Sequence, residues 1–411
     1  MATRPLKLEF EGARGAHLAA RLDLPAGPVR AFALFAHCFT CSKDIAAARH
    51  VAGALSREGI AVLRFDFTGL GGSGGDFAST NFSSNVEDLK LAADYLRQNF
   101  EAPQLLIGHS LGGAAVLAVA GDIPEVRAVA TIGAPSDAGH VIHNFHGSLD
   151  EIREAGESKV DLGGRSFTIR KEFVDDLEAQ TVRRKVAEMK RALLVLHAPL
   201  DETVGVENAT DIFLAARHPK SFISLDKADH LLTREEDAAY AARVIAAWAS
   251  GYLVESRQLE TTEVADGVEV AETGLGKFQS MVAVGHHRLI ADEPASYGGF
   301  DSGPSPYDYL SAALAACTVM TLRMYADRKG VTVDRIKTRV LHGKVHAADC
   351  EDCSAQMQAR SGKVDRFERL ITLDGDLDQV TRARMLEIAD KCPVHRTLEA
   401  GAAVVTKVLE K

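Results

Sequence analysis

Two features are absent from this 411-residue sequence: a long apolar run and an amino-terminal secretory signal. A membrane-spanning helix needs about 18 consecutive apolar residues, and no stretch of the chain supplies them. The opening residues, MATRPLKLEFEGARG, lack the apolar core of a secretory leader. We therefore expect a cytoplasmic protein with no membrane partner.

Cysteine is sparse, and positive charge does not predominate. Six cysteines are too few for the disulfide scaffold of a secreted protein of this length. The formal net charge of −10 argues against a broad phosphate-binding surface, so nucleic acid is not expected as a partner. The length favours two domains, each large enough to bury a core of its own.

A short apolar run meets a helix of small residues within residues 104–120. Leu105, Leu106 and Ile107 are typical of a buried strand, and the next five residues, GHSLG, match the GxSxG nucleophile elbow. The elbow needs small residues because the strand turns into the helix within about one residue, which directs the serine hydroxyl outward. Ser110 is thus the candidate nucleophile, and the alternative is an ordinary glycine-containing turn.

The same half of the chain alternates apolar strands with helices, which is the pattern of a mostly parallel, doubly wound α/β sheet. The glycine-rich loop at residues 66–76 lacks a phosphate-loop lysine, so no nucleotide cofactor is expected. Residues 135–190 are polar and helix-prone, which suits a lid over the site. Strands are expected within residues 6–24 and at 31–36, 60–65, 105–107, 127–133, 192–199 and 220–225, and helices at 44–58, from a capping box of Ser84 and Glu87, and at 235–252.

Two further candidates, Asp201 and His230, each follow a predicted strand, where ligands meet an open α/β sheet. In chain order, Ser110, Asp201 and His230 match the hydrolase triad, in which the histidine takes the serine's proton and the carboxylate fixes the histidine tautomer. The alternatives are that Asp201 caps the following helix and that His230 serves a surface loop. Asp226 and Asp229 are the rival acids.

A resemblance to small serine esterases and acyl-peptidases of the α/β-hydrolase family rests on four motifs within about residues 1–250: HCFTCSKD, GHSLGG, HAPLDETV and DKADHLL. The resemblance implies an oxyanion hole of two backbone amides, which fall on Leu111 and Phe39. The loop that carries Phe39 usually reads HGFTGSK in the family. Here Cys38 and Cys41 replace both glycines, and cysteine does not adopt positive φ as cheaply as glycine.

A polar connector near residue 255 divides the chain into predicted domains at residues 1–255 and 256–411. The second domain begins with alternating stretches, followed by a long helix that starts at a capping box of Ser305 and Asp308 and ends at Gly330. Strands are expected at residues 334–346 and 366–373, a helix at 378–391, and a last strand at the end of the chain.

Three motifs of this second domain, DEP, GPSPYDYLSAALAACT and ADKCPVH, resemble the osmotically induced protein C (OsmC) family over about residues 260–411. The resemblance implies a small α+β fold in an intertwined homodimer that reduces organic hydroperoxides with two cysteines. Those cysteines fall on Cys317, to which the resemblance gives the attacking role, and on Cys392. Peroxide attack requires a thiolate, and the alternative is that both cysteines pack as small apolar side chains.

The match is incomplete at the residues that would assist the cysteines. Family peroxidases carry a glutamate directly after the helix-starting proline, and that position is Tyr307 here. Asp308 is expected on the opposite helix face from Cys317, where it caps the helix. Arg288 is the candidate for the family's arginine.

These observations predict an α/β-hydrolase fold, with a mostly parallel sheet and a lid insertion, followed by an α+β OsmC-like domain. The expected enzyme is a serine carboxylesterase for a small-molecule ester, fused to a thiol-based domain that reduces organic hydroperoxide. It uses no cofactor and forms a homodimer through the C-terminal domain. The alternative makes that domain a non-redox dimerisation or ligand-binding module.

Two CxxC pairs remain. A disulfide between Cys38 and Cys41 would shift the Phe39 amide, so that oxidation slows the esterase. The alternative is a permanently reduced loop in which both cysteines only pack.

The second pair, Cys350 and Cys353, lies near His346 and His342, and these four side chains have the ligand types of a zinc site. Acidic residues at positions 349, 351 and 352 are instead typical of an exposed polar turn. One CxxC is half of the usual four-cysteine pattern, so no metal is expected.

Overall fold

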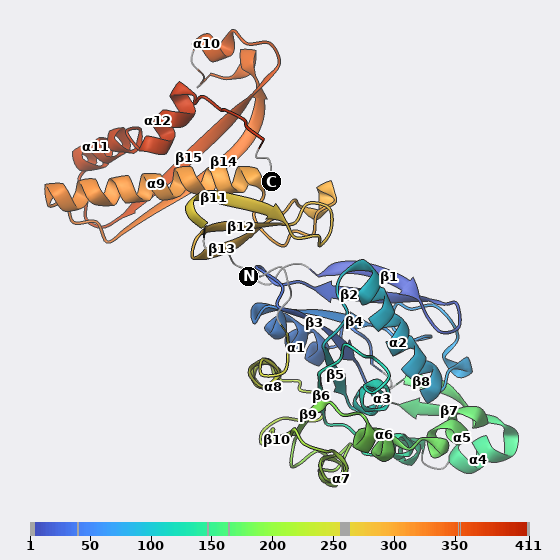
Figure 1. Ribbon diagram of the computed structural model, residues 1–411. Coiled ribbons are helices and arrows are strands. Elements are labelled where there is room, and N and C mark those ends of the chain that lie inside the picture. Colours follow the sequence, from blue (N-terminus) through green and yellow to red (C-terminus); the bar gives the residue numbers. More distant parts are fainter. Residues whose placement is uncertain are drawn as a thin grey trace. The chain divides into compact units, whose positions relative to one another are not determined.

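The computed structural model describes residues 5–38, 41–145, 148–162, 165–254, 264–351, 353 and 355–408. The chain forms two compact units, Met1–Gly303 and Pro304–Lys411. Figure 1 labels their helices and strands. This division lies later than the boundary predicted near residue 255, because residues after the connector pack with the first unit. Leu275 joins its core, and the ring of Phe300 lies 5.8 Å from that of Phe100.

The first unit is built on an eight-stranded sheet in the order β1-β2-β4-β3-β5-β6-β9-β10. The pairings of β2 with β1 and β4 are antiparallel, and the strands from β4 to β10 in this order run parallel, as predicted. The strands are Leu6–Glu11 (β1), His17–Asp23 (β2), Ala31–Ala36 (β3), Ile60–Phe65 (β4), Leu105–His109 (β5), Ala128–Ile132 (β6), Ala192–His197 (β9) and Lys220–Ser224 (β10).

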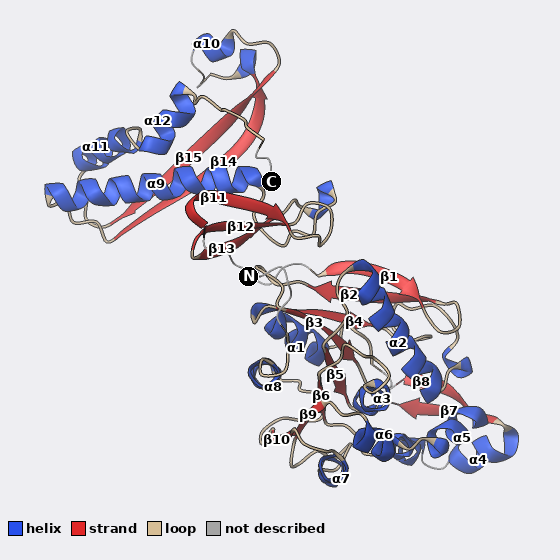
Figure 2. Cartoon of the chain, in the orientation of Figure 1, coloured by secondary structure: helices blue, strands red, loops and turns tan. Residues whose placement is uncertain are grey.

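Helices cover both faces of this sheet, and each face has its own core (Figure 2). Along β3, Phe32 and Leu34 belong to one buried cluster and Ala33 and Phe35 to the other, because successive strand side chains point to opposite faces. Burial on both faces explains why the central strands are apolar throughout. The first cluster includes side chains of α2 (Phe82–Asn99), α3 (Leu111–Val119) and α7 (Glu207–Ala215), and the second those of α1 (Ala46–Arg57) and α8 (Glu235–Ala249).

Helix α2 begins earlier than its predicted capping box. Its N-cap is Asn81, whose side chain accepts a hydrogen bond from the Ser84 amide at 2.8 Å, while the Ser84 hydroxyl accepts one from the Asn81 amide at 3.0 Å. Ser84 is therefore the third residue of the first turn, and the predicted pairing of Ser84 with Glu87 is wrong. Asparagine and serine can both cap the unpaired amides at the start of a helix. The sequence alone therefore does not decide between a cap at Asn81 and a cap at Ser84.

The lid insertion contains a β-hairpin that was not predicted. β7 (Glu157–Leu162) pairs antiparallel with β8 (Arg165–Arg170). The rings of Phe77 and Phe167 lie 4.9 Å apart, which joins the hairpin to the segment before α2. The other elements of the insertion are η2 (Ala138–Phe145), α4 (Ser148–Ala155), α5 (Lys171–Ala179) and α6 (Val182–Glu188).

The remaining elements follow the predicted order. A three-stranded antiparallel sheet, β11 (Val264–Glu272), β12 (Ser280–Gly285) and β13 (His287–Ala291), ends the first unit. In the second unit, the long helix α9 packs on a hairpin and on two shorter helices. The bounds are α9 Pro306–Lys329, β14 Arg335–His346, α10 Ala355–Gln358, β15 Lys363–Asp374, α11 Gln379–Ala389 and α12 Pro393–Ala400.

The last predicted strand does not form within residues 401–408, which have no regular secondary structure. Val404, Val405 and Val408 are 89%, 77% and 90% exposed there. A strand forms only where a neighbouring strand pairs with its backbone groups, and within the described part of the chain no strand pairs with this segment.

Helix α9 also differs from the prediction that no segment resembles a membrane span. Of the described helices, it alone is long and apolar enough to cross a membrane. Of its apolar 18-residue stretch, 22% is buried within the chain. The likeness lies in length and composition, which core helices of soluble proteins share.

Candidate active sites

Ser110 connects β5 to α3 in a strained conformation. Its φ of 54° and ψ of −127° are unusual for any residue with a side chain. Glycines surround the turn because backbone approaches them closely: a Cβ on Gly112 would lie 2.4 Å from the carbonyl oxygens of Ala36 and His37. The sequence thus folds into the predicted elbow at Ser110.

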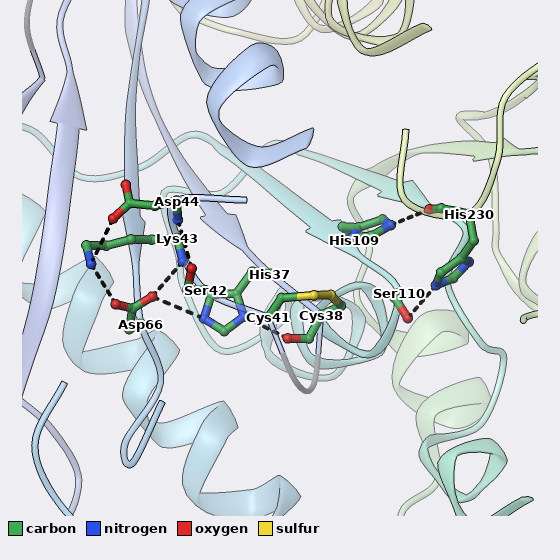
Figure 3. Close-up of a disulfide and its surroundings, with 10 residues drawn as sticks. All are labelled: His37, Cys38, Cys41, Ser42, Lys43, Asp44, Asp66, His109, Ser110 and His230. Carbon is green, nitrogen blue, oxygen red and sulfur yellow. Dashed lines mark hydrogen bonds and ion pairs between the residues drawn. A yellow bond between two sulfur atoms is a disulfide. The ribbon is translucent and has the colours of Figure 1, made fainter. Parts of the chain in front are cut away.

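Of the three residues predicted to form a triad, His230 lies within hydrogen-bonding distance of the other two. His230 Nε2 is 3.0 Å from Ser110 Oγ, and His230 Nδ1 is 2.7 Å from Asp201 Oδ2. Figure 3 shows the contact of Ser110 with His230. The elbow, the loop after β9 and the loop after β10 therefore meet at the carboxyl edge of the sheet, as the strand order requires.

Asp201 is held as a carboxylate. Burial opposes its charge, but hydrogen bonds from His230 and from the amides of Thr203 and Val204, each at 2.9 Å, keep its pKa below the usual value. The rival acids have other partners, since Asp226 accepts from the Ser224 hydroxyl and Asp229 from the Thr233 amide and hydroxyl.

Two residues beside the triad were not identified from the sequence. His109 Nε2 lies 2.7 Å from the carbonyl oxygen of His230, and burial lowers the pKa of His109 to about 4. Neutral His109 therefore donates to the backbone that carries His230. Gly133 leaves space for the triad, because a Cβ there would lie 3.2 Å from Asp201 Oδ2 and 3.3 Å from His230 Nδ1. The position of His109 inside GHSLG was the available signal.

Of the two predicted oxyanion donors, Leu111 and Phe39, the structure describes Leu111. Leu111 is the first residue of α3, and an amide at that position has no acceptor within its own helix. Phe39 lies outside the described residues. On either side of it, Cys38 and Cys41 form a disulfide with a Cα–Cα distance of 5.2 Å (Figure 3). The Cys38 carbonyl accepts from the Cys41 amide at 3.1 Å and from His37 Nδ1 at 2.7 Å.

A buried charge cluster anchors the far end of this loop. Asp66 is completely buried and accepts from Lys43 Nζ at 2.6 Å, from the Lys43 amide and from the Gly72 amide at 2.7 Å. Buried carboxylates need such pairing, because an unpaired charge is costly away from water. Burial also lowers the pKa of the adjacent His37, which stays neutral.

The second unit brings Cys317 and Cys392 together. Cys317, on α9, is half-buried, and Cys392 is completely buried at the N-cap of α12. Burial opposes ionisation of Cys392. However, hydrogen bonds from the His395 amide at 3.3 Å, from Cys317 and from Thr318 hold the pKa of Cys392 below its ordinary value.

The predicted helper residues are placed elsewhere. Asp308 forms the capping box of α9 with Ser305, as predicted. Tyr307 stacks on His342 with ring centroids 4.1 Å apart, and Arg288 donates to the backbone carbonyls of Gly285 and His287. Arg369, which no sequence motif indicated, donates to Thr318 Oγ1 at 3.1 Å beside the cysteine pair.

The residues considered for zinc do not form a ligand set. Cys350 and Cys353 are joined in a disulfide, which removes both thiolates as ligands. His342 Nε2 lies 2.9 Å from Asp365. Over the described ranges, no three or more His, Cys, Asp or Glu side chains are grouped to hold a metal ion.

The strand order and the serine elbow define the first unit as an α/β-hydrolase. Residues 28–153 match the family model described as "Serine aminopeptidase, S33", and residues 299–407 match the model described as "OsmC-like protein". The chain therefore belongs to the α/β-hydrolase family and carries an OsmC-like domain in the same polypeptide.

A solved structure narrows the class of hydrolase to which the first unit belongs. The esterase domain of a Rhodothermus marinus protein is 54% identical, with a TM-score of 0.51, and the match covers 61% of this chain and 99% of that one. The first unit is accordingly a hydrolase domain of the esterase type.

Curated relatives match the hydrolase over a shorter range. Mouse mitochondrial palmitoyl-protein thioesterase ABHD10 is 27% identical over 188 residues, which are 44% of this chain and 62% of that protein. Its rat counterpart is 35% identical over 101 residues, or 25% of this chain and 33% of that protein. The chain thus spans less than two thirds of either relative.

Proposed function

We propose that the first unit hydrolyses acyl esters with Ser110 as nucleophile. The observation that carries this proposal is the hydrogen-bonded series Ser110–His230–Asp201 on a strained elbow. A serine hydroxyl is a weak nucleophile until a base takes its proton, and here Nε2 of His230 lies 3.0 Å from the hydroxyl oxygen.

The proposed reaction is acyl transfer to Ser110 followed by hydrolysis. His230 accepts the serine proton during attack and returns it to the leaving alcohol, and Asp201 stabilises the imidazolium in between. The amides of Leu111 and Phe39 donate hydrogen bonds to the carbonyl oxygen and stabilise the negative charge that develops on it. The acyl enzyme then reacts with water that His230 activates in the same way.

The test is hydrolysis of short-chain nitrophenyl esters. We expect Ser110→Ala to lower kcat/KM by about 1,000-fold or more, and Asp201→Asn by about 1,000- to 10,000-fold. The matched control is Asp226→Asn, the rival acid, which should remain within about twofold of wild type. Unchanged activity in Ser110→Ala would exclude the assignment. Because the curated relatives are named palmitoyl-protein thioesterases, a long-chain acyl thioester is the second substrate to assay.

We propose for the OsmC-like domain a thiol-dependent reduction of organic hydroperoxides. This proposal is supported by the contact of Cys317 with Cys392 and by the lowered pKa of Cys392. Peroxide loss is followed with a dithiol reductant in wild type and in Cys317→Ser. Loss of turnover in the variant is the expected result, whereas no turnover in wild type would favour a non-redox binding or dimerisation module.

We also propose that the chain forms a homodimer through this domain. The support is apolar surface left uncovered in one copy, including Met320 and Met324 on α9, which are 65% and 71% exposed. Sedimentation velocity should give a dimer for wild type and a monomer for Met320→Glu/Met324→Glu. A monomeric wild-type protein would exclude the dimer.

A further inference from the structure

A buried hydroxyl lies next to the cysteine pair. Thr318 directly follows Cys317 on α9 and is completely inaccessible to solvent. Its Oγ1 accepts a hydrogen bond from Arg369 at 3.1 Å and carries a single proton of its own. Two acceptors lie within reach of that proton, the Leu314 carbonyl at 2.8 Å and Cys392 Sγ at 3.9 Å.

Arg369 connects this hydroxyl to the segment that carries Cys392. The arginine side chain is only 11% exposed and extends from β15. Besides Thr318 it binds the carbonyl of Ala389, the last residue of α11, at 3.0 Å, and the carboxylate of Asp390 at 2.5 Å. Since α11 ends three residues before Cys392, one guanidinium fixes both the hydroxyl and the approach to the thiol.

The surroundings of Cys392 favour a negative charge on its sulfur. The sulfur accepts the His395 amide at the start of α12, where unpaired amides stabilise an anion. The imidazole of His395 lies 3.5 Å from the carboxylate of Glu399. Other charged or titratable groups nearby are Cys317 and Arg369 on the packed elements, Asp390 and Lys391 just before Cys392, and Arg396 in the first turn of α12.

We propose that Arg369 and Thr318 are positioning residues that keep the negative charge of the resting cysteine pair on Cys392, which takes the proton of Cys317 as Cys317 attacks the peroxide. Arg369 donates a hydrogen bond to the threonine oxygen and leaves the hydroxyl proton available. That proton can turn from the Leu314 carbonyl toward the Cys392 sulfur when the sulfur is charged. The assignment replaces Arg288, the arginine suggested by sequence. Its use in catalysis rests on the proposed peroxidase function, but the charge placement does not.

With this charge placement, the two cysteines reduce an organic hydroperoxide in two steps. As Cys317 sulfur attacks the outer peroxide oxygen, its proton passes to Cys392, a sulfur–oxygen bond forms and the oxygen–oxygen bond breaks to release alkoxide. The alkoxide takes the proton from Cys392 and leaves as alcohol. The Cys392 thiolate then displaces hydroxide from the sulfenic acid of Cys317, which gives the disulfide. Two electrons pass from the pair to the peroxide, and a dithiol reductant restores them.

The experiment is an ultraviolet titration of thiolate in the full chain, without peroxide. Cys317→Ser is the background, because serine keeps a hydrogen-bond donor and leaves Cys392 as the titrating thiol of the pair. Subtracting the curve of Cys317→Ser/Cys392→Ser removes contributions from the other cysteines. In this background, Thr318→Val and Arg369→Met should each raise the Cys392 pKa by about one unit, which lowers the thiolate fraction at neutral pH up to about tenfold.

Conservative variants separate positioning from folding. Thr318→Ser keeps the hydroxyl and should restore the titration of the background protein. Arg384→Met removes an arginine that pairs with Glu387 on α11, away from the hydroxyl, and should leave the curve unchanged. Circular dichroism establishes that each variant is folded.

Curves for Thr318→Val and Arg369→Met that coincide with the background would overturn the proposal, as would a shift of equal size in Arg384→Met. A shifted titration in a protein that never consumes peroxide would leave the charge placement standing and exclude the peroxidase function. The two proposals can therefore fail separately.

Discussion

The imidazole of His109 is fully buried beside Ser110, and its neutrality has a consequence for stability. Burial lowers the pKa of His109 from 6.5 to about 4. Between these two values the unfolded chain binds a proton that the folded chain does not. The free energy of unfolding should therefore fall as the pH drops from 6.5 to 4, by at most about 3 kcal/mol from this group.

The measurement compares urea unfolding of wild type and His109→Gln at both ends of that pH range. Fluorescence of Trp248 reports the first unit, because it is the only tryptophan in the chain and lies on α8. The variant should lose less stability on acidification than wild type, whereas His17→Gln, on the exposed side of β2, should behave as wild type. Equal acid sensitivity in wild type and His109→Gln would contradict the assignment of the proton.

At this scale, sequence reasoning succeeds where a residue's neighbours are fixed by local geometry. The elbow at Ser110 and the capping box at Ser305 are each determined within a few residues, so spacing predicts them. Arg369 lies 51 residues from Thr318, and no periodicity relates the two positions. Only the packing of β15 against α9 brings them together, and that packing depends on the whole unit.

The turn from β5 into α3 tolerates no side chain at Gly112. A Cβ there would lie 2.4 Å from the backbone oxygens of Ala36, the last residue of β3, and His37, and backbone cannot move aside cheaply. Gly112→Ala should destabilise the first unit by about 1–3 kcal/mol and lower ester hydrolysis. Gly121→Ala is the control, since a Cβ there would lie at an ordinary contact distance of 3.6 Å from the Cα of Met189. A stable, active Gly112→Ala protein would be inconsistent with this close approach.

The loop between β3 and α1 carries the Cys38–Cys41 bridge and the expected donor, Phe39. In protein first reduced with a dithiol, mild peroxide treatment should close the bridge and lower kcat for esters by about 100- to 1,000-fold, because the loss of one oxyanion donor has that effect, and renewed reduction should restore kcat. Cys38→Ser/Cys41→Ser should be insensitive. The prediction fails if both proteins respond equally or if wild type does not respond.

Among the elements, the strands of the main sheet could be predicted because burial on both faces makes them continuously apolar. The lid hairpin could not, since β7 and β8 mix charged and apolar residues and depend on contacts such as Phe167 with Phe77. The final strand was predicted from its valines, but pairing, not composition, decides whether a strand forms.

The whole molecule has two separate sets of candidate catalytic residues, each in a unit with its own core. Ser110→Ala should therefore abolish ester hydrolysis and leave peroxide consumption within about twofold of wild type, and Cys317→Ser should do the reverse. Both activities are measured on the same preparations of the full chain. Loss of both in either single variant would show that the units depend on each other.

The two disulfides of the molecule join cysteines only three positions apart. Each closes a ring of four residues, so neither ties one secondary-structure element to a distant one. Reducing both disulfides would give the unfolded chain back only the small entropy that short rings remove from it. The free energy of unfolding would fall by about 2 kcal/mol for each bridge, while every long-range contact stays in place. The architecture therefore does not depend on a covalent link between distant elements, and the sulfur atoms can gain or lose electrons while the long-range packing of the chain is kept.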